Sequence, residues 1–245
     1  MHPNIRRGYV ETDQRDFAPE QVILLQKAQK DIIYLVDHDY NIMNSVTFVG
    51  NHFQLSARQR TALTRATVNA KKGRQRRQAC IQLVEGRTLY IDGFNLIITL
   101  EAALSPDTTI LRCMDGTVRD ICGLRGTYKL IESTTAALHM IGNVLTGLKV
   151  KQVVFYLDAP VSNSGRLRAE ILEVMAKCAV PADVKLVSNA DARLWDKECV
   201  VSSDSIILDR CCSWINLAEM IIAENLAERR IIDLSNDFQR NKCGV

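Results

Sequence analysis

The sequence predicts an α/β fold: an open, mainly parallel sheet with helices on both faces, preceded by a small all-α module. From residue 86 onward, short apolar runs alternate with segments of helical periodicity. Runs such as VVFYL lack polar alternation, as expected of parallel strands that are covered on both faces. Before residue 73 the patterns are helical instead. We therefore divide the chain into a helical basic module over 1–72, a basic linker over 73–85 and an α/β domain over 86–245.

Three helices are expected in the N-terminal module. The first is capped by Asp16, has Pro19 in its first turn and ends near Asp39. A short second helix breaks near Gly50, and the third starts at Ser56 as its cap and continues through the segment ARQRTALTRATVNAKK.

Basic residues are concentrated in one block of the chain. From Tyr40 to Val84 there is no Asp or Glu, although the net charge of the whole chain is only +3. Such a block is typical of a polyanion contact, and a solvated basic linker is the alternative. The expected nucleic-acid contacts are Arg58, Arg65, Lys72, Arg74, Arg76 and Arg77.

Four of these residues, Arg58, Arg65, Lys72 and Arg76, recur at steps of seven and four, which would place them on one helix face. A basic helix after a tight turn is compatible with helix-turn-helix packing against nucleic acid, and also with an ordinary solvated helix face.

The α/β domain has elements of both kinds in alternation. The strands are expected in TLYIDGFN, KQVVFYLD, DVKLVSN, ECVVSSD and RIIDLS, and the helices in TYKLIESTTAALHMIGNVLTGL, SGRLRAEILEVMAKCA and SWINLAEMIIAENL. After the first strand, TTILRCMDGTVRDICG has an Asp-Gly turn between two short runs, which indicates an inserted hairpin.

Four predicted strands each place an acid at or just beyond their carboxyl ends, namely Asp92, Asp158, Asp191 and Asp204. In an open parallel sheet these ends share one edge, where ligands bind. Carboxylates gathered there repel one another unless a cation joins them, and Mg²⁺ or Mn²⁺ is the natural partner. Each acid taken singly could instead cap the turn that follows its strand.

After Asp158 the sequence continues as APVSNSGRLRAE, into a helix. Asn163, Ser164 and Arg166 could cradle a phosphate there, or simply cap an exposed helix.

Several other classes of protein are excluded or disfavoured. The sequence contains no P-loop, no Gly-x-Ser-x-Gly elbow and no Gly-x-Gly-x-x-Gly fingerprint. Its eight cysteines lack Cys-x-x-Cys spacing, which favours reduced thiols over a zinc site. No apolar run is long enough to span a membrane and the N-terminus lacks a signal-peptide core, so we expect a cytoplasmic protein without a membrane partner. Homodimer formation stays open.

The segments YIDGFNLI, VVFYLDAP, VKLVSNADARL and VVSSDSIIL come in the order seen in NYN domains, and the chain from about residue 86 to 235 resembles these relatives of PIN-domain nucleases. The whole chain, including SVTFVGNHFQLSARQRTAL, also resembles a prokaryotic family known only as a domain of unknown function.

The NYN resemblance implies a PIN/NYN-like fold and a nuclease dependent on Mg²⁺ or Mn²⁺. It implies that Asp92, Asp158 and Asp204 are metal ligands, that Asp191 is a further ligand or a water-orienting base, and that Asn95 is a positioning amide. Arg166 would contact phosphate, and the basic N-terminal module would hold the nucleic acid, RNA being favoured over DNA. Two alternatives stay open: a non-catalytic nucleic-acid-binding protein with a degenerate PIN-like site, and a small-molecule phosphohydrolase or phosphotransferase.

Overall fold

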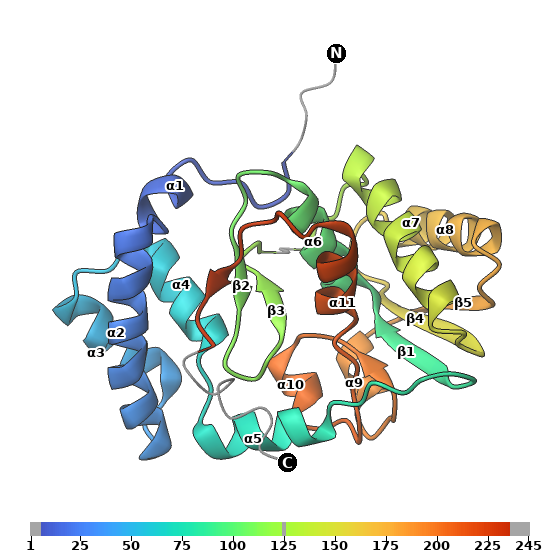
Figure 1. The fold of residues 1–245 in the computed structure, drawn as a ribbon. Helices are drawn as coiled ribbons and strands as arrows, with labels where there is room; N and C mark the ends of the chain where they lie inside the picture. The colour runs from blue at the N-terminus through green and yellow to red at the C-terminus, as the bar shows by residue number, and fades with distance from the viewer. Residues whose placement is uncertain (1–5, 124–125, 236–245) are drawn as a thin grey trace.

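The chain folds around a parallel sheet, seen on the right of Figure 1. The computed structural model describes residues 6–123 and 126–235. The strand order is β5-β4-β1-β6, and every neighbouring pair is parallel. The four strands are β1 (Thr88–Asp92), β4 (Gln152–Asp158), β5 (Ala182–Val187) and β6 (Val200–Val201). The predicted α/β class and mainly parallel sheet are confirmed.

Helices cover both faces of this sheet, as the uninterrupted apolar strands require. On one face Leu89, Ile91 and Phe155 share a core with the long helices. On the other face Val154 and Tyr156 pack on short helices and Trp214. The first group is α6 (Gly93–Leu104), α7 (Glu132–Gly147), α8 (Ser164–Lys177) and α11 (Leu217–Asn225), and the second is α9 (Ala190–Leu194) and α10 (Ser205–Leu208).

Helix α6 replaces the continuation of the first strand that the run GFNLIITL suggests. All of its residues from Phe94 to Ala103 are buried except Asn95, which is partly exposed. A helix that is apolar on every side has no polar face to reveal its period, so the sequence does not distinguish it from a buried strand.

A second sheet lies beside the first and has the order β3-β2-β7, from β2 (Ile110–Arg112), β3 (Val118–Asp120) and β7 (Ile232–Asp233). Strands β2 and β3 form the predicted antiparallel hairpin, with Gly116 in its turn at a φ of +89°. Strand β7, expected in the same sheet as the other strands, pairs with β2 instead.

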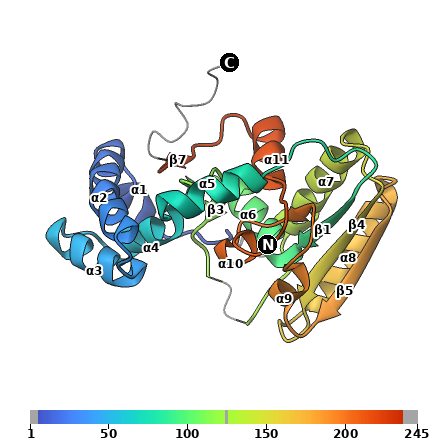
Figure 2. The same cartoon turned by 90° about the horizontal axis from the view of Figure 1, so that it is seen from below.

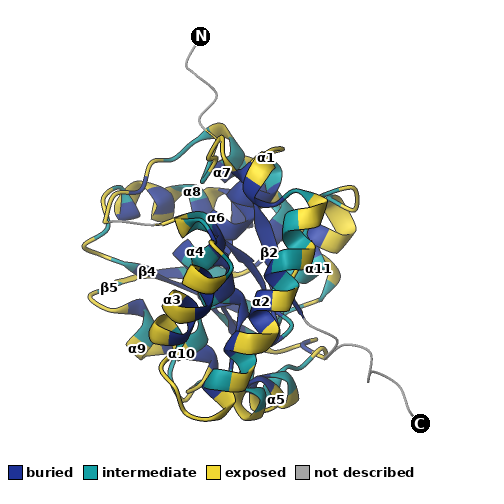
Figure 3. Ribbon diagram, turned by 90° about the vertical axis from the view of Figure 1, so that its left-hand side faces the viewer, coloured by how far each residue is buried: buried dark blue, intermediate teal, exposed yellow. Residues whose placement is uncertain are grey.

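The N-terminal region is helical, as predicted: α1 (Asp13–Asp16), α2 (Pro19–Asp37), α3 (Ile42–His52), α4 (Ala57–Ala66) and α5 (Ala70–Ala79). Ser56 caps α4 and forms a capping box with Gln59. The apolar sides of α2, α3 and α4 share one core with Leu111 of β2 and Ile232 of β7. Figure 3 shows the outer sides of α2 and α3 exposed to solvent.

Two details of this region differ from the prediction. Asp16 does not cap the first long helix, because it is buried and accepts a hydrogen bond from Ser56 Oγ (2.7 Å). The single helix expected from Ser56 to Lys72 is two helices, since Thr67 leaves the helical conformation and Asn69 caps α5. Arg58 and Arg65 therefore do not share a helix with Lys72 and Arg76.

Helix α5 also occupies the first part of the stretch 73–85, which was expected to be a linker. Figure 2 shows α5 extending from the N-terminal helices across the second sheet. The division of the chain into a module over 1–72 and a domain over 86–245 stays a prediction. Residues of both parts lie in one hydrophobic core.

Two further findings concern the described residues only. None of their helices is both long and apolar enough to cross a membrane. None of their seven cysteines forms a disulfide with another described residue, and Cys243 lies outside the described residues.

Candidate functional site

The four predicted acids all lie at the carboxyl edge of the main sheet. Asp92 is the last residue of β1 and Asp158 is the last residue of β4. Asp191 lies in the first turn of α9, after β5, and Asp204 caps α10, after β6. Because the strands are parallel, these ends share one edge.

Asp92 is the most enclosed of the four. Only 7% of its surface is exposed, and its Oδ2 accepts a hydrogen bond from Ser202 Oγ (2.8 Å). Burial raises the pKa of Asp92 to about 7, and the negative charges of Asp191 and Asp204 add to this rise. A cation beside this carboxyl would relieve both effects.

The other acids are electrically coupled to Asp92 or to one another. Partial burial raises the pKa of Asp191, and Asp204 and Asp158 raise it further. Asp158 Oδ1 accepts the backbone N–H of Ala190 (2.9 Å), and Asp204 Oδ1 accepts that of Ile206 (2.7 Å). Asp158 and Asp204 thus also have the turn-capping role that any strand-end acid could have.

Asn95 fixes the segment that carries Asp204. Its Oδ1 accepts hydrogen bonds from the backbone N–H (2.9 Å) and the hydroxyl (3.0 Å) of Ser203. Ser202 and Ser203, two neighbours in the sequence, therefore bind Asp92 and Asn95 respectively. Their role was missed, because serines that precede an acid have no distinctive spacing.

Oxygen donors of this kind suit Mg²⁺ or Mn²⁺, which bind through one or two carboxylates together with waters and substrate phosphates. Within residues 6–123 and 126–235, no group of three or more His, Cys, Asp or Glu side chains is arranged to hold a metal ion. Asp92, Asp158 and Asp204 are therefore not brought together as a closed ligand set. A cation at this edge would take one or two of these carboxylates and complete its coordination with waters.

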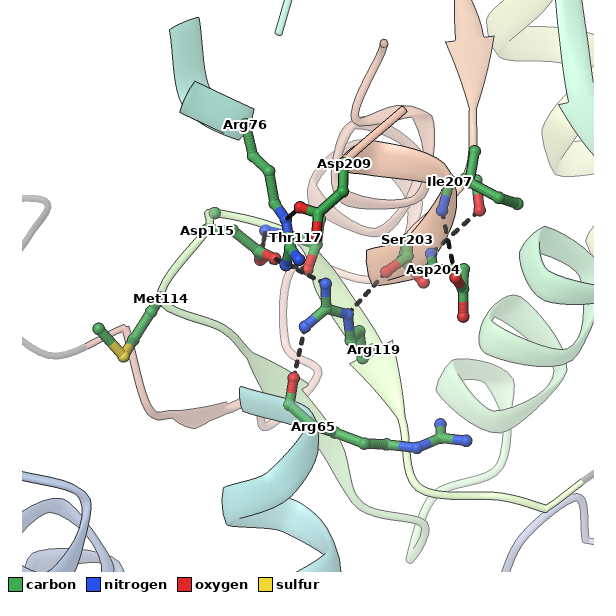
Figure 4. A network of polar contacts seen from close by, with 12 residues as sticks. Arg65, Arg76, Met114, Asp115, Thr117, Arg119, Ser203, Asp204, Ile207 and Asp209 are labelled. Carbon is green, nitrogen blue, oxygen red and sulfur yellow. Dashed lines mark hydrogen bonds and ion pairs between the residues drawn. The ribbon is translucent and has the colours of Figure 1, made fainter. Parts of the chain in front are cut away.

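Arg119, on the hairpin strand β3, is a second side chain that sequence analysis missed (Figure 4). Its Nε donates to the carbonyl of Ser203 (2.7 Å) and its Nη2 to Asp115 Oδ2 (2.6 Å), while Nη1 donates to the carbonyl of Arg65. Burial alone would lower the pKa of Arg119, but Asp115 outweighs this and raises it.

Asp115, in the hairpin turn, joins Arg119 to helix α5 (Figure 4). It is 1% exposed, and Arg76 Nη1 lies 2.8 Å from its Oδ2. Burial would raise the pKa of Asp115, but the two guanidinium groups hold it down at about 2. Arg76 Nε also pairs with Asp209 (2.7 Å), the residue that follows α10. Both ends of α10 are thus linked to Arg76 of α5. The segment before α10 is linked through Ser203, Arg119 and Asp115. The residue after α10, Asp209, pairs with Arg76 directly.

A cavity of about 1180 Å³ opens beside this network. Its walls come from α2, α4, α5 and the acidic edge, and they include Asn95, Arg119, Ser203 and Asp204. On the α5 side the lining contains Lys71, Lys72, Arg74 and Arg76. Of the four acids, only Asp204 lines it.

The expected basic contacts divide into two groups. Arg58 pairs with Asp13 (2.8 Å), Arg65 donates to the carbonyl of Asp120 (2.6 Å), and Arg77 donates to that of Met114 (2.5 Å). Together with the buried Arg76, these side chains hold the fold together. Those of Lys72 and Arg74 lie on the surface, and so does that of Lys71, which was not among the expected contacts.

The loop after Asp158 uses its polar side chains locally. Asn163 Nδ2 donates to the carbonyl of Tyr128 (2.7 Å), and Ser164 Oγ donates to that of Ala159 (3.3 Å). Arg166 is exposed on α8. Asn163 and Ser164 therefore anchor the loop, and their hydrogen bonds leave Arg166 as the better candidate of the three for a phosphate contact.

Comparison with known proteins gives the following matches. Residues 81–220 match a family described as a domain of unknown function (DUF5616), and residues 24–78 match a protein family of unknown function (DUF434). An uncharacterised protein of Methanocaldococcus jannaschii, MJ0935, is 36% identical over 186 residues, which cover 75% of this chain and 88% of that protein. No solved structure matches the chain.

Proposed function

The chain belongs to the DUF5616 family, and from its site we propose that it is a metal-dependent nuclease that hydrolyses phosphodiester bonds, with RNA favoured over DNA. One observation carries the proposal. Four strand-end acids are electrically coupled at one sheet edge, and that edge opens at Asp204 into a cavity with a basic rim.

Charge and size support a polymeric phosphate substrate. The exposed cations Lys71, Lys72 and Arg74 face the same cavity as Asp204, which suits a ligand whose charge is spread along a backbone. The cavity volume of about 1180 Å³ also exceeds the roughly 300–1,000 Å³ typical of small-molecule sites. The preference for RNA rests on the resemblance to NYN domains alone.

Each residue of the edge would have a distinct role. Asp92 and Asp204 would hold the metal with its waters, and Asp158 would be a third or water-mediated ligand. Bound Mg²⁺ or Mn²⁺ would supply Lewis-acid stabilisation of the charge that develops on the scissile phosphate. Asp191, less enclosed than Asp92 and with a raised pKa, is suited to accept a proton from water. Asn95 and Arg119 would keep the Ser202–Asp204 segment in place.

A non-catalytic nucleic-acid-binding protein is the second candidate. The observation that favours it is the capping role of Asp158 and Asp204, which gives both acids a structural reason to be present. Such a protein would bind nucleic acid in a salt-sensitive way that does not depend on Asp92.

Titration calorimetry with Mn²⁺, followed by incubation with a panel of RNA and DNA substrates, tests the proposal. We expect Mn²⁺ binding and Mn²⁺-dependent cleavage in the wild type, and the loss of both in Asp92→Asn and Asp204→Asn. Asp31→Asn, which changes an exposed acid on α2, is the matched control and should behave as wild type. If the wild type binds no Mn²⁺ and cleaves nothing, the nuclease proposal fails. If it still binds RNA, the second candidate takes its place.

A further inference from the structure

The same cavity is also lined by an exposed aromatic side chain. Tyr40 is 62% exposed and lines the same cavity as Lys71, Lys72 and Arg74. Single exposed aromatic side chains are common on protein surfaces, but a ring that lines the same cavity as three cations matches a ligand with both flat and charged parts.

The backbone presents Tyr40 from a fixed corner. Asp39 adopts a left-handed conformation (φ 65°), and the N–H of Tyr40 donates to the carbonyl of Leu35 (3.2 Å), which closes the end of α2. The ring is thus carried by an ordered turn.

The start of α5, which carries the cations, is tied to this corner. Asn69 Nδ2 donates to the carbonyl of Val36 (3.1 Å), and the N–H of Ala70 donates to Asp37 Oδ1 (2.7 Å). These two bonds join the start of α5 to the end of α2, so the spacing between Tyr40 and the first turn of α5 is set before any ligand arrives. Preorganisation of this kind lowers the entropic cost of binding.

Charge decides which part of a ligand lies where. The exposed acid Asp39 is next to Tyr40 and also lines the cavity, so a phosphate is disfavoured directly beside the ring. Phosphates are favoured along α5, beside Lys71 and Arg74. A nucleobase on Tyr40 with its phosphates toward α5 satisfies both walls, and the cavity is continuous from there to Asp204.

We propose that Tyr40 is a base-stacking residue, and that Tyr40 with Lys71, Lys72 and Arg74 forms a nucleotide-binding subsite for a single strand whose next phosphates lead along α5 to the acidic edge. The subsite rests on the proposed function in so far as the ligand is a nucleic acid. It adds that the protein contacts bases as well as backbone, remote from the reacting phosphate.

Binding of two polymers with equal charge tests the subsite. One is a fluorescein-labelled oligouridine of about 12 nucleotides, within the site sizes of single-strand binders, and the other is an abasic oligomer with the same number of phosphates. Affinities are measured by fluorescence anisotropy with the full chain in EDTA, so that metal-dependent cleavage does not occur. We expect the wild type to bind the oligouridine about tenfold more tightly than the abasic oligomer, the ratio that one stacked base supplies.

Three variants separate stacking from other effects. Tyr40→Ala should bring the ratio close to one by weakening only the oligouridine complex, whereas Tyr40→Phe should retain the ratio because the ring is kept. Tyr34→Ala is the matched control, since Tyr34 on α2 is 65% exposed but does not line the cavity. It should leave the ratio unchanged.

The outcomes that overturn the subsite differ from those that overturn the nuclease. A ratio near one in the wild type, or a ratio that Tyr40→Ala leaves intact, overturns the subsite even if RNA is cleaved. A ratio that depends on Tyr40 supports the subsite even if no substrate is ever cut. Failure of the wild type to bind either polymer overturns the subsite and nucleic acid as the ligand together.

Discussion

Asp92 ends a buried strand with a charge that its surroundings do not neutralise. Ser202 supplies one hydrogen bond, and the neighbouring acids Asp191 and Asp204 oppose ionisation. An acid kept in such a place without a cationic partner lowers the stability of the free protein. Such a cost is typical of a ligand-binding site, and the ligand proposed for this one is a cation.

The pH dependence of stability should report this cost. The pKa of Asp92 is about 7 in the folded chain against 3.8 for an unperturbed aspartate, so between these two pH values the folded chain holds a proton that the unfolded chain has lost. Stability therefore falls as pH rises, by about 3 kcal/mol between pH 5 and pH 8. Urea unfolding in EDTA measures it. Asp92→Asn should remove most of the fall and Asp31→Asn none. An equal fall in Asp92→Asn would show that Asp92 is not its source.

Gly93 follows Asp92 and allows the close approach of β4. A Cβ at this position would lie 2.5 Å from Leu157 Cδ2 and 3.2 Å from the carbonyl oxygen of Tyr156. Gly93→Ala should therefore lower the unfolding free energy by about 1–3 kcal/mol. Gly165→Ala, on the first turn of α8, meets nothing within 4 Å and should be neutral or stabilising by up to about 1 kcal/mol. Equal effects of the two substitutions in urea unfolding would contradict this account.

The position of the acids at one edge could be predicted from the sequence, because each follows an apolar run and parallel strands share their direction. Their partners could not be predicted. Arg119 belongs to a hairpin that is distant from Ser203 in the sequence and contacts it only in the folded chain. Ser202 and Ser203 are identical neighbours in the sequence, yet they bind different partners, Asp92 and Asn95. Asp115 belongs to the Asp-Gly turn of that hairpin, and nothing in the sequence of the turn indicates that it is almost completely buried.

At the scale of elements, the break between α4 and α5 decides the use of the basic residues. Because Asn69 starts a new helix, Arg58 and Arg65 turn toward α1 and the hairpin, whereas Lys72 and Arg76 turn toward Asp209. Periodicity across residues 57–72 is continuous enough to suggest one helix. The break is set by Thr67 and Asn69, whose preferences for extended and capping conformations are local and weak.

The link between α5 and the hairpin should be sensitive to the loss of its central acid. Asp115→Asn leaves Arg76 and Arg119 buried without their shared countercharge, which typically costs about 3–5 kcal/mol. Asp183→Asn is the control, because the Asp183–Lys185 pair (3.8 Å) is half exposed and should contribute less than about 1 kcal/mol. Denaturant unfolding compares them. Similar values for the two variants would mean that the guanidinium groups find other acceptors.

At the scale of the whole molecule, the exposed cations lie on the rim of a cavity that reaches the acidic edge, while the other arginines of residues 40–84 are buried or half-buried and are bonded within the fold. The electrostatic footprint suggested by the sequence is thus smaller than the number of its arginines indicates. The sequence alone does not distinguish basic residues that are bonded within the fold from those that are exposed, because the packing of α4 and α5 decides which is which.

The salt dependence of RNA binding should measure this smaller footprint. Neutralising two surface cations in Lys71→Gln/Arg74→Gln should reduce the slope of log affinity against log salt by about 1.4, roughly 0.7 for each lost phosphate contact with a single strand. Lys177→Gln, on α8 and paired with Glu173, should leave the slope unchanged. An unchanged slope in the double variant would place the polyanion elsewhere on the surface.

The shared core of the N-terminal helices has a consequence for synthesis on the ribosome. Helices α2 to α4 emerge first, but the strand that completes their apolar surface, β7, is translated more than 150 residues later. Gln29 Nε2 donates to the carbonyl of Leu234 (3.0 Å), which is translated equally late, as well as to the hydroxyl of Thr67. The apolar surface of α2, α3 and α4 in the nascent chain therefore stays partly uncovered through most of its elongation. A chain that ended before residue 232 would leave part of this surface exposed and would be prone to aggregation.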